Sequence, residues 1–292
     1  MTGPREDVMI RRLCVVGTGL IGGSLARDLR RLGEVGEVVG SSRNAANLQR
    51  AVDLGIIDRF DVDVARAAAG ADMVVVAVPL GATESVFEGI RDALDDDAII
   101  TDVGSAKGSV VEAARTALGA RLSRFVPAHP VAGTEHSGVD ASVERLFEDR
   151  RVIVTPTAET DADALQRVSA MWTIVGADVI EMDVDHHDEV LAATSHLPHM
   201  LAYTLVDVLG RTSRRAEIFG YSAGGLRDFT RVASSDPQMW HDICSANRDA
   251  IVKELERFRA ALDRLTDAVR REDGEYVRSV FTRAKSTRDE YF

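Results

Sequence analysis

Polar and ionisable side chains lie at or just after the ends of two apolar stretches that are typical of buried strands. One stretch ends in Asp102, and Ser105 and Lys107 come next in the chain. The other, residues 125–130, contains His129 between an alanine and a proline. Histidine titrates near neutral pH, so His129 is a candidate acceptor for a substrate hydroxyl proton. Each of the other three is either a site residue or an ordinary turn or loop residue.

A second set of candidates lies in the last third of the chain. His196 precedes Pro198, which cannot donate a helical hydrogen bond and therefore predicts a kink. A histidine at a kink either lines a site or is a packed core residue. Arg227 and Arg231 can bind carboxylates through their planar guanidinium groups, or Arg227 can pair structurally with a nearby aspartate. Asp236, followed by a proline, predicts the start of another helix.

The sequence His-His-Asp-Glu at 186–189 has the composition of a metal site. Adjacent histidines on a helix point to different sides, and no separate cluster of ligands accompanies them. We therefore predict a solvated helix start at this position and no metal ion.

The strongest motif lies near the N-terminus. An apolar stretch precedes a G-x-G-x-x-G sequence formed by Gly17, Gly19 and Gly22, and a helical pattern follows it. In this context the motif is a dinucleotide fingerprint. The three glycines permit a tight turn, approach of a pyrophosphate and close helix packing, respectively. Leu20 and Ile21 open the helix, whose free N–H groups bind phosphate.

The residues after the second apolar stretch bear on the choice of nucleotide. An NAD site usually has an acidic residue about 20 positions after the glycines, but this chain has Ser41, Ser42 and Arg43 there. Hydroxyls and a guanidinium suit a 2′-phosphate, which favours NADP over NAD. The alternative is an exposed loop arginine without a ligand. Val78 and Pro79, at the end of another apolar stretch, are expected to line the nicotinamide side.

Composition narrows the class of protein. The 292 residues leave room for two domains. A net charge of −12 argues against nucleic acid or an anionic membrane as the main partner. No long uncharged apolar run predicts a membrane span, and the first ten residues lack the apolar core of a signal peptide. Two cysteines make no disulfide scaffold, so we expect a reduced, cytoplasmic protein.

Periodicity predicts two different halves. Up to residue 182 strands and helices alternate, which predicts an α/β fold with a Rossmann-like doubly wound sheet, extended beyond the minimal fold. From residue 183 helical spacing takes over, so we expect domains at 1–182 and 183–292. The helical half has more apolar faces than one small bundle buries, which predicts a homodimer. The expected strands after the second are residues 73–79, 98–103, 125–130, 151–155 and 177–182.

Together, these segments resemble a known family, the prephenate/arogenate (cyclohexadienyl) dehydrogenases of tyrosine biosynthesis. Small departures occur at Ala106 and Val131, where the family more often has valine and methionine. The matching segments occur in the family's order: GTGLIGGSL at 17–25, VAVP at 76–79, TDVGSAK at 101–107, HPVAGTEHSG at 129–138, TSHLPH at 194–199 and GGLRDFTRVASSDPQMW at 224–240.

The resemblance implies a dinucleotide domain, a helical dimerisation domain and oxidative decarboxylation of a cyclohexadienol. In the family, hydride leaves ring carbon C4 for the nicotinamide, and carbon dioxide then leaves C1. The residue matching His129 bonds the C4 hydroxyl and helps to take its proton. The residue matching Ser105 supports both that hydroxyl and the histidine. The residue matching Arg231 binds the ring carboxylate, and that matching His196 lies near the substrate side chain.

Several points stay open. Thr134 and His136, in the loop after the candidate base, are further candidate substrate contacts, but they assign no preference between prephenate and arogenate. Feedback by tyrosine, a product-like ligand for the active site, is also open. The rival classes are a 3-hydroxy acid dehydrogenase or imine reductase and a non-enzymatic nucleotide sensor. The first class is expected to use a helical-domain lysine, and only Lys253 and Lys285 are available.

Overall fold

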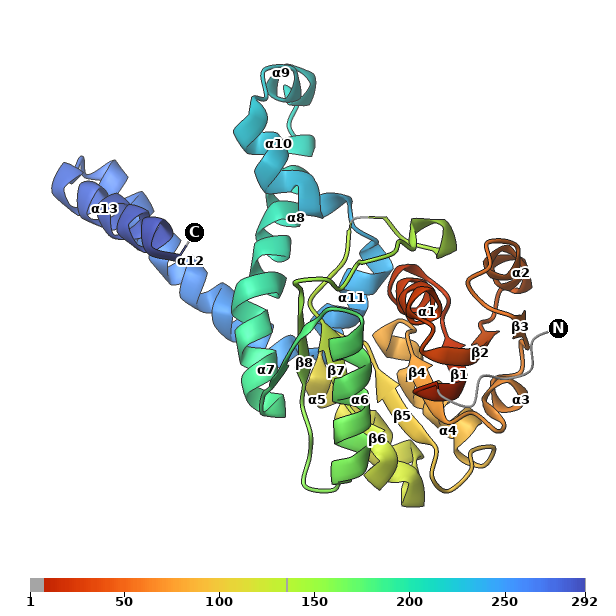
Figure 1. The fold of residues 1–292 in the computed structure, drawn as a ribbon. Helices are drawn as coiled ribbons and strands as arrows, with labels where there is room; N and C mark the ends of the chain where they lie inside the picture. The colour runs from red at the N-terminus through yellow and green to blue at the C-terminus, as the bar shows by residue number, and fades with distance from the viewer. Residues whose placement is uncertain (1–7, 135, 292) are drawn as a thin grey trace.

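A parallel six-stranded sheet forms the centre of the N-terminal part (Figure 1). The computed structural model describes residues 8–134 and 136–291. The strand order is β3-β2-β1-β4-β5-β6, and each neighbouring pair is parallel. The order reverses between β1 and β4, where such sheets bind ligands at the strands' carboxyl ends. The strands are Ile10–Val16 (β1), Val35–Ser41 (β2), Arg59–Phe60 (β3), Met73–Val76 (β4), Ile99–Asp102 (β5) and Phe125–Val126 (β6).

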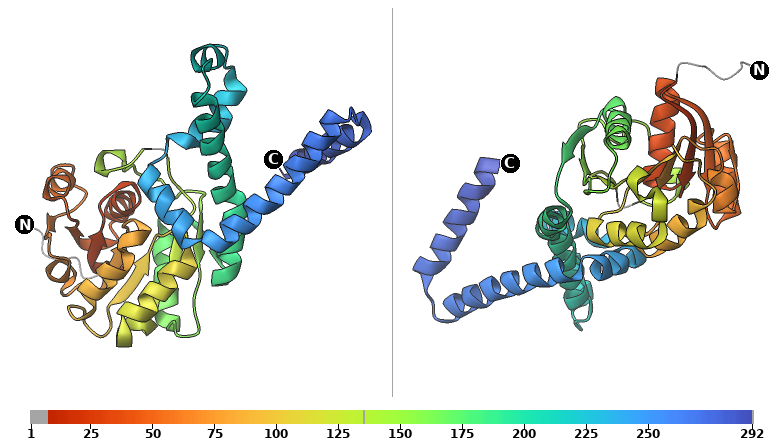
Figure 2. Two further views of the ribbon diagram at one scale, coloured as in Figure 1. Left: turned by 180° about the vertical axis from the view of Figure 1, so that it is seen from behind. Right: turned by 90° about the horizontal axis from the view of Figure 1, so that it is seen from below.

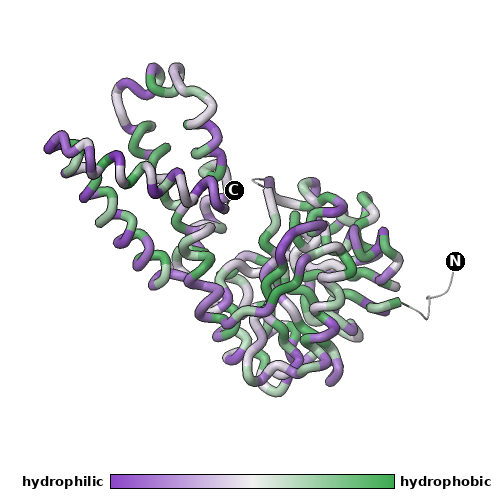
Figure 3. Tube along the Cα trace, turned by 60° about the vertical axis from the view of Figure 1, so that its left-hand side comes forward, coloured by the Kyte–Doolittle hydropathy of each residue, from purple (hydrophilic) through white to green (hydrophobic). Residues whose placement is uncertain are grey.

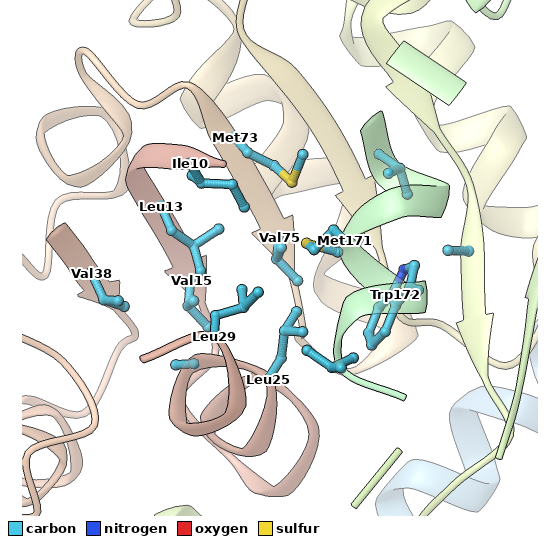
Figure 4. Close-up of a cluster of buried hydrophobic side chains, with 14 of the residues drawn as sticks. Ile10, Leu13, Val15, Leu25, Leu29, Val38, Met73, Val75, Met171 and Trp172 are labelled. Atoms are coloured by element: carbon cyan, nitrogen blue, oxygen red, sulfur yellow. The ribbon is translucent and has the colours of Figure 1, made fainter. Parts of the chain in front are cut away.

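Successive strand residues face opposite sides of this sheet, and both sides are buried. In β1, Leu13 and Val15 join one apolar cluster, whereas Cys14 and Val16 join the other. Figure 4 shows the first cluster, in which Met171 lies beside Val75 of β4 and Trp172 lies farther from the strands. The predicted doubly wound sheet is therefore confirmed. The first face is covered by Leu20–Leu32 (α1), Ala45–Asp53 (α2) and Ala162–Ile174 (α6), the second by Val64–Ala68 (α3), Thr83–Arg91 (α4) and Lys107–Ala117 (α5).

The later strands form a separate three-stranded sheet. Its order is β7-β8-β9, with Ala128–Pro130 (β7) antiparallel to Arg151–Val154 (β8) and Asp178–Glu181 (β9) parallel to β8. The single extended sheet expected from the sequence is thus wrong in this respect. Pro127 has no N–H for a ladder, and the next N–H binds the side chain of Asp102 at 3.2 Å instead of a strand. The predicted strand at 125–130 is therefore divided between the two sheets.

The described residues after Glu181 form helices and no strand. A π-helical turn, Ala192–His196 (η4), separates the first two of these helices. Asp236 caps α11 by accepting the Met239 N–H at 2.9 Å, as its sequence predicts. The α-helices are Val184–Leu191 (α7), Leu197–Gly210 (α8), Arg215–Gly220 (α9), Gly224–Thr230 (α10), Pro237–Ala246 (α11), Arg248–Arg270 (α12) and Gly274–Tyr291 (α13).

Two helical arms project from the body of the molecule. One contains α8, α9 and α10, and the other contains α12 and α13 (Figures 1 and 2). Hydrophobic residues recur along both arms (Figure 3), and several are exposed, among them Leu262 at 49% and Phe281 at 58%. Within the described ranges, no helix is apolar over enough residues to cross a membrane. Cys14 is buried and Cys244 half-buried, and both are unpaired.

Candidate active site

The glycine turn has the geometry that a bound dinucleotide needs. Gly17 has a φ of +99°, and a Cβ atom there would lie 2.1 Å from the Ala77 carbonyl oxygen. A Cβ on Gly22 would lie 2.3 Å from the Gly17 carbonyl oxygen. A Cβ on Gly19 would meet nothing within 4 Å, so its backbone borders open space. Among the described residues, no side chain caps the start of α1 at Leu20, which leaves N–H groups for a phosphate. These residues fit a dinucleotide.

The second strand ends beside this turn. The backbone carbonyl of Ser41 accepts the N–H of the first fingerprint glycine at 2.8 Å, and Ser41 itself is buried. Ser42 is half-buried and Arg43 is exposed. Val78, half-buried, and Pro79, exposed, lie just after β4, the strand on the other side of β1. The structure thus brings the predicted cofactor residues to one edge of the sheet.

His129 is nearly buried in β7. Its side chain is 8% exposed, and its Nδ1 atom lies 2.9 Å from Nε2 of His187. Burial lowers the pKa of His129 well below 6.5, and the neighbouring His187, Lys107 and His196 lower it further. The imidazole is therefore neutral at physiological pH and has the capacity to take up a proton.

A buried ion pair lies directly beside this histidine. The Nζ atom of Lys107 is 2.5 Å from Oδ2 of Asp102 and donates to the Ala128 carbonyl oxygen at 2.7 Å. Both charged side chains are buried, so the interpretation of Lys107 as a solvated loop residue is wrong. The pair ties the end of β5 to the strand that carries His129. Ser105 lies half-buried in the turn between the two charged residues.

The predicted solvated helix start at 186–189 is wrong for two of its residues. His186 is exposed, but His187 is fully buried and Asp188 is largely buried beneath it. The Nδ1 atom of His187 lies 2.8 Å from Oδ1 of Asp188. Adjacent helix residues do point to different sides, and α7 packs one of those sides against α5. Within the described ranges, no group of three or more metal-binding side chains occurs.

The kink expected near Pro198 is the π-helical turn that ends at His196. His196 is fully buried, and its Nδ1 atom lies 3.2 Å from the Nδ2 amide nitrogen of Asn247. The amide donates, so the ring proton of neutral His196 is on Nε2, an atom without a hydrogen-bond partner among the described residues. Its ring meets Trp240 edge-on, with centroids 6.0 Å apart. Burial lowers the pKa of His196 to about 4.

The arginine candidate lies on the far side of this histidine. Arg231 is exposed and begins a short 3₁₀ turn that packs against α8. Burial lowers the pKa of His199, and the positive charge of Arg231 lowers it further. His199 stacks on Trp240 with centroids 3.8 Å apart. Thr134 and His136 are exposed, with the Thr134 hydroxyl accepting the His136 N–H at 3.2 Å.

Asn247 and Trp240 connect these residues. The Asn247 amide donates to the Asp188 carbonyl oxygen at 2.8 Å and to Nδ1 of His196 at 3.2 Å. Trp240 contacts the rings of both His196 and His199. His196 therefore links the neighbourhood of His129 to that of Arg231.

The sequence indicated a site at the kink beside the two histidines His196 and His199, but it assigned a role only to His196. It did not single out His187, Asp188 or Asn247 as site residues. The spacing of three between His196 and His199 places them on one helix face and is a usable signal. No pattern in the sequence indicates that His187 is buried.

Two family models match the chain. The model for the nucleotide-binding domain of prephenate dehydrogenase matches residues 25–181, and that for its dimerization domain matches residues 183–283. A cyclohexadienyl dehydrogenase from Zymomonas mobilis is 37% identical over 96% of this chain and 96% of its own length.

The fold of this chain is also similar to solved structures of prephenate and arogenate dehydrogenases. Prephenate dehydrogenase from A. aeolicus, in complex with hydroxyphenyl propionate and NAD+, has a TM-score of 0.91 and 37% identity. The match covers 98% of this chain and 100% of that one. Synechocystis arogenate dehydrogenase has a TM-score of 0.79 and 28% identity, covering 96% of this chain and 100% of that one.

Proposed function

The chain belongs to the prephenate dehydrogenase family, and we propose on this premise that it oxidises and decarboxylates prephenate, arogenate or both in tyrosine biosynthesis. The products are 4-hydroxyphenylpyruvate, tyrosine or both. Residues 1–182 are proposed as the dinucleotide domain and residues 183–292 as the substrate and dimerisation domain.

The observation that carries this proposal is the state of His129. It is a neutral, nearly buried imidazole on a short strand tied to the carboxyl end of β5. A nicotinamide bound at this edge of the sheet supplies a hydride acceptor. Hydride loss from C4 requires loss of the hydroxyl proton as well, and a neutral histidine is an efficient acceptor for it.

In the proposed reaction, His129 takes up one proton and later returns it. His129 takes the proton from the C4 oxygen as the C4–H bond breaks. The C1–carboxylate bond breaks next and carbon dioxide leaves. The electron pair of that bond stays with the ring, which becomes an aromatic phenolate. The proton held by His129 returns to that phenolate oxygen. No net proton is released, so the site needs no further acid or base.

Other residues are proposed to position the substrate. Arg231 binds the ring carboxylate and acts by positioning more than by activation. Ser105 supports the C4 hydroxyl. His196 lies towards the substrate side chain, and Thr134 and His136 are further contacts on the loop after β7.

The cofactor preference is proposed as NADP, with NAD as the alternative. The support is local: exposed Arg43 and the hydroxyls of Ser41 and Ser42 lie at the carboxyl end of β2, where an acidic residue would favour the ribose 2′-hydroxyl of NAD. The A. aeolicus relative is bound to NAD+, so the assay must compare both nucleotides.

A homodimer is proposed from the two projecting arms. Their exposed apolar side chains, such as Phe229 at 51% and Val269 at 62%, have no cover in one chain, and residues 183–283 match a dimerization domain. Sedimentation as a monomer at micromolar concentration would contradict this. Tyrosine is proposed as a competitive inhibitor, because it resembles the product. A cytoplasmic location is proposed as well, because free cysteines are typical of a reducing compartment.

The deciding experiment is a spectrophotometric assay of reduced nicotinamide with prephenate and arogenate, each with NAD+ and NADP+. Reduction of nicotinamide together with release of carbon dioxide supports the proposal. The 3-hydroxy acid and imine reductase alternatives lack their expected base, because Lys253 and Lys285 are exposed and paired with Glu189 and Asp289. A nucleotide sensor would bind the cofactor and reduce none of it.

A further inference from the structure

Three side chains form a chain of contacts that ends at the proposed base. Oδ1 of Asp188 lies 2.8 Å from Nδ1 of His187, and Nε2 of His187 lies 2.9 Å from Nδ1 of His129. We infer that Asp188 and His187 are a positioning pair that fixes the proton of His129 on Nδ1 and leaves Nε2 as the base. The inference rests on the proposed function, because that function gives His129 its task.

Asp188 can act only as an acceptor in this arrangement. Its carboxylate accepts the backbone N–H groups of Lys107 and Gly108, at 2.8 and 2.9 Å, at the N-terminus of α5. Burial alone would raise the pKa of Asp188, but hydrogen bonds from His187 and from these two N–H groups hold it below its usual value. An ionised carboxylate has no proton to donate, so Nδ1 of His187 must donate to it.

His187 is then neutral with its proton on Nδ1. It is fully buried, and burial lowers its pKa although the hydrogen bond to Asp188 opposes the change. A neutral imidazole has one donor and one acceptor nitrogen, so Nε2 of His187 accepts. The atom that faces it, Nδ1 of His129, must be the donor. Nε2 of His129 is therefore the unprotonated nitrogen.

The surrounding charges keep this order. The charge of Lys107, which is paired with Asp102, lowers the pKa of both His129 and His187 and so disfavours their protonation. A positive charge on His187 would turn its Nε2 atom into a donor and reverse the tautomer of His129. When His129 takes the substrate proton, its bond to His187 becomes charge-assisted and the anionic carboxylate behind His187 offsets the new charge.

Two substitutions separate positioning from packing. His187→Gln places an amide oxygen near the former Nε2 atom and can still accept from His129. His187→Leu fills similar space and accepts nothing. We expect the leucine variant to lose about 10- to 100-fold in kcat, by analogy with the loss when the hydrogen-bond partner of a metal-ligating histidine is removed, with KM little changed. The glutamine variant should retain most of the activity. His186→Gln, on the exposed neighbour, is the matched control and should behave as the parent.

Nitrogen-15 NMR of histidine-labelled full-length protein tests the tautomer directly. The His129 signals are assigned by their absence in His129→Asn. The parent and the glutamine variant should show a protonated Nδ1 and a bare Nε2, whereas the leucine variant should show a mixture or the reverse. A parent His129 protonated on Nε2, or a leucine variant with unchanged tautomer and kcat, overturns the inference. If the leucine variant does not fold, the parent spectrum and the glutamine variant decide.

This measurement does not depend on turnover. If the parent oxidises neither prephenate nor arogenate, the proposed function fails while the NMR result still reports the tautomer. If the parent is active and its His129 carries the proton on Nε2, the inference alone fails.

Discussion

The Nδ1 atom of His129 lies 2.9 Å from the Nε2 atom of His187, although 58 positions separate the two residues in the chain. The contact joins a strand of the sheet-containing part to the first helix of the helical part. The base and its orienting partner thus come from the two parts of the protein that periodicity separates. Correct packing of α7 is therefore a condition for an ordered base.

Replacement of the base should affect turnover more than binding. We expect His129→Asn to lower kcat by roughly 10²–10⁴-fold with little change in KM, because asparagine occupies similar space but accepts no proton at neutral pH. Steady-state kinetics with the preferred substrate measure this. An unchanged kcat would remove His129 from the mechanism.

Replacement of the carboxylate-binding arginine should have the opposite signature. Arg231→Ala removes the proposed pairing with the ring carboxylate. Loss of one partner of a charge pair that is buried in the complex costs about 2–5 kcal/mol, so KM should rise steeply if bound substrate covers the exposed guanidinium. The control is Arg248→Ala, since Arg248 is an exposed arginine paired with its neighbour Asp249. Equal KM values for the Arg231 variant and the parent would refute the assignment.

The cofactor preference should follow Arg43. Arg43→Asp replaces a donor to a 2′-phosphate with an acceptor for a ribose 2′-hydroxyl, so the ratio of kcat/KM for NADP+ to that for NAD+ should fall. The KM of the organic substrate is the internal control and should stay constant. If the ratio does not move, Arg43 does not read the nucleotide.

The buried ion pair beside the base should be essential to stability. Lys107→Met leaves Asp102 buried without its cation, which costs about 3–5 kcal/mol of unfolding free energy. Denaturant unfolding measures the loss. Lys253→Met breaks an exposed pair with Glu189 and should leave the unfolding midpoint near that of the parent. Similar midpoints for both variants would contradict this account.

Acid should destabilise the protein partly through His196. Its pKa is about 4 in the folded chain and about 6.5 for a solvated histidine, so the unfolded state binds more protons between these values. Stability from this group is complete above about pH 6.5 and is lost as the pH falls towards 4. At 1.4 kcal/mol per unit, the loss at pH 5 is on the order of 2 kcal/mol.

The variant His196→Gln removes this titration. Its melting temperature should fall less steeply than that of the parent between pH 7 and pH 5. His186→Gln, at an exposed position, should keep the parental slope. A parental slope in the His196 variant would assign the acid sensitivity to other groups.

The local features of the fold were readable from the sequence, because each depends on residues close together in the chain. The glycine spacing from Gly17 to Gly22 predicts a strand, turn and helix, and alternating apolar residues predict the buried strands. The proline after Asp236 predicts a helix start, and Pro198 a helical irregularity. His129 stood out because of its place at a strand end.

Tertiary structure decided what these elements place together. No local pattern shows that Pro127 divides one predicted strand between two sheets, or that Lys107 is buried against Asp102. Helical spacing shows that His186 and His187 face different sides, but it does not show which side meets α5. Burial and partners depend on contacts between distant segments, and these contacts determine whether a histidine is solvated or aligned behind the base.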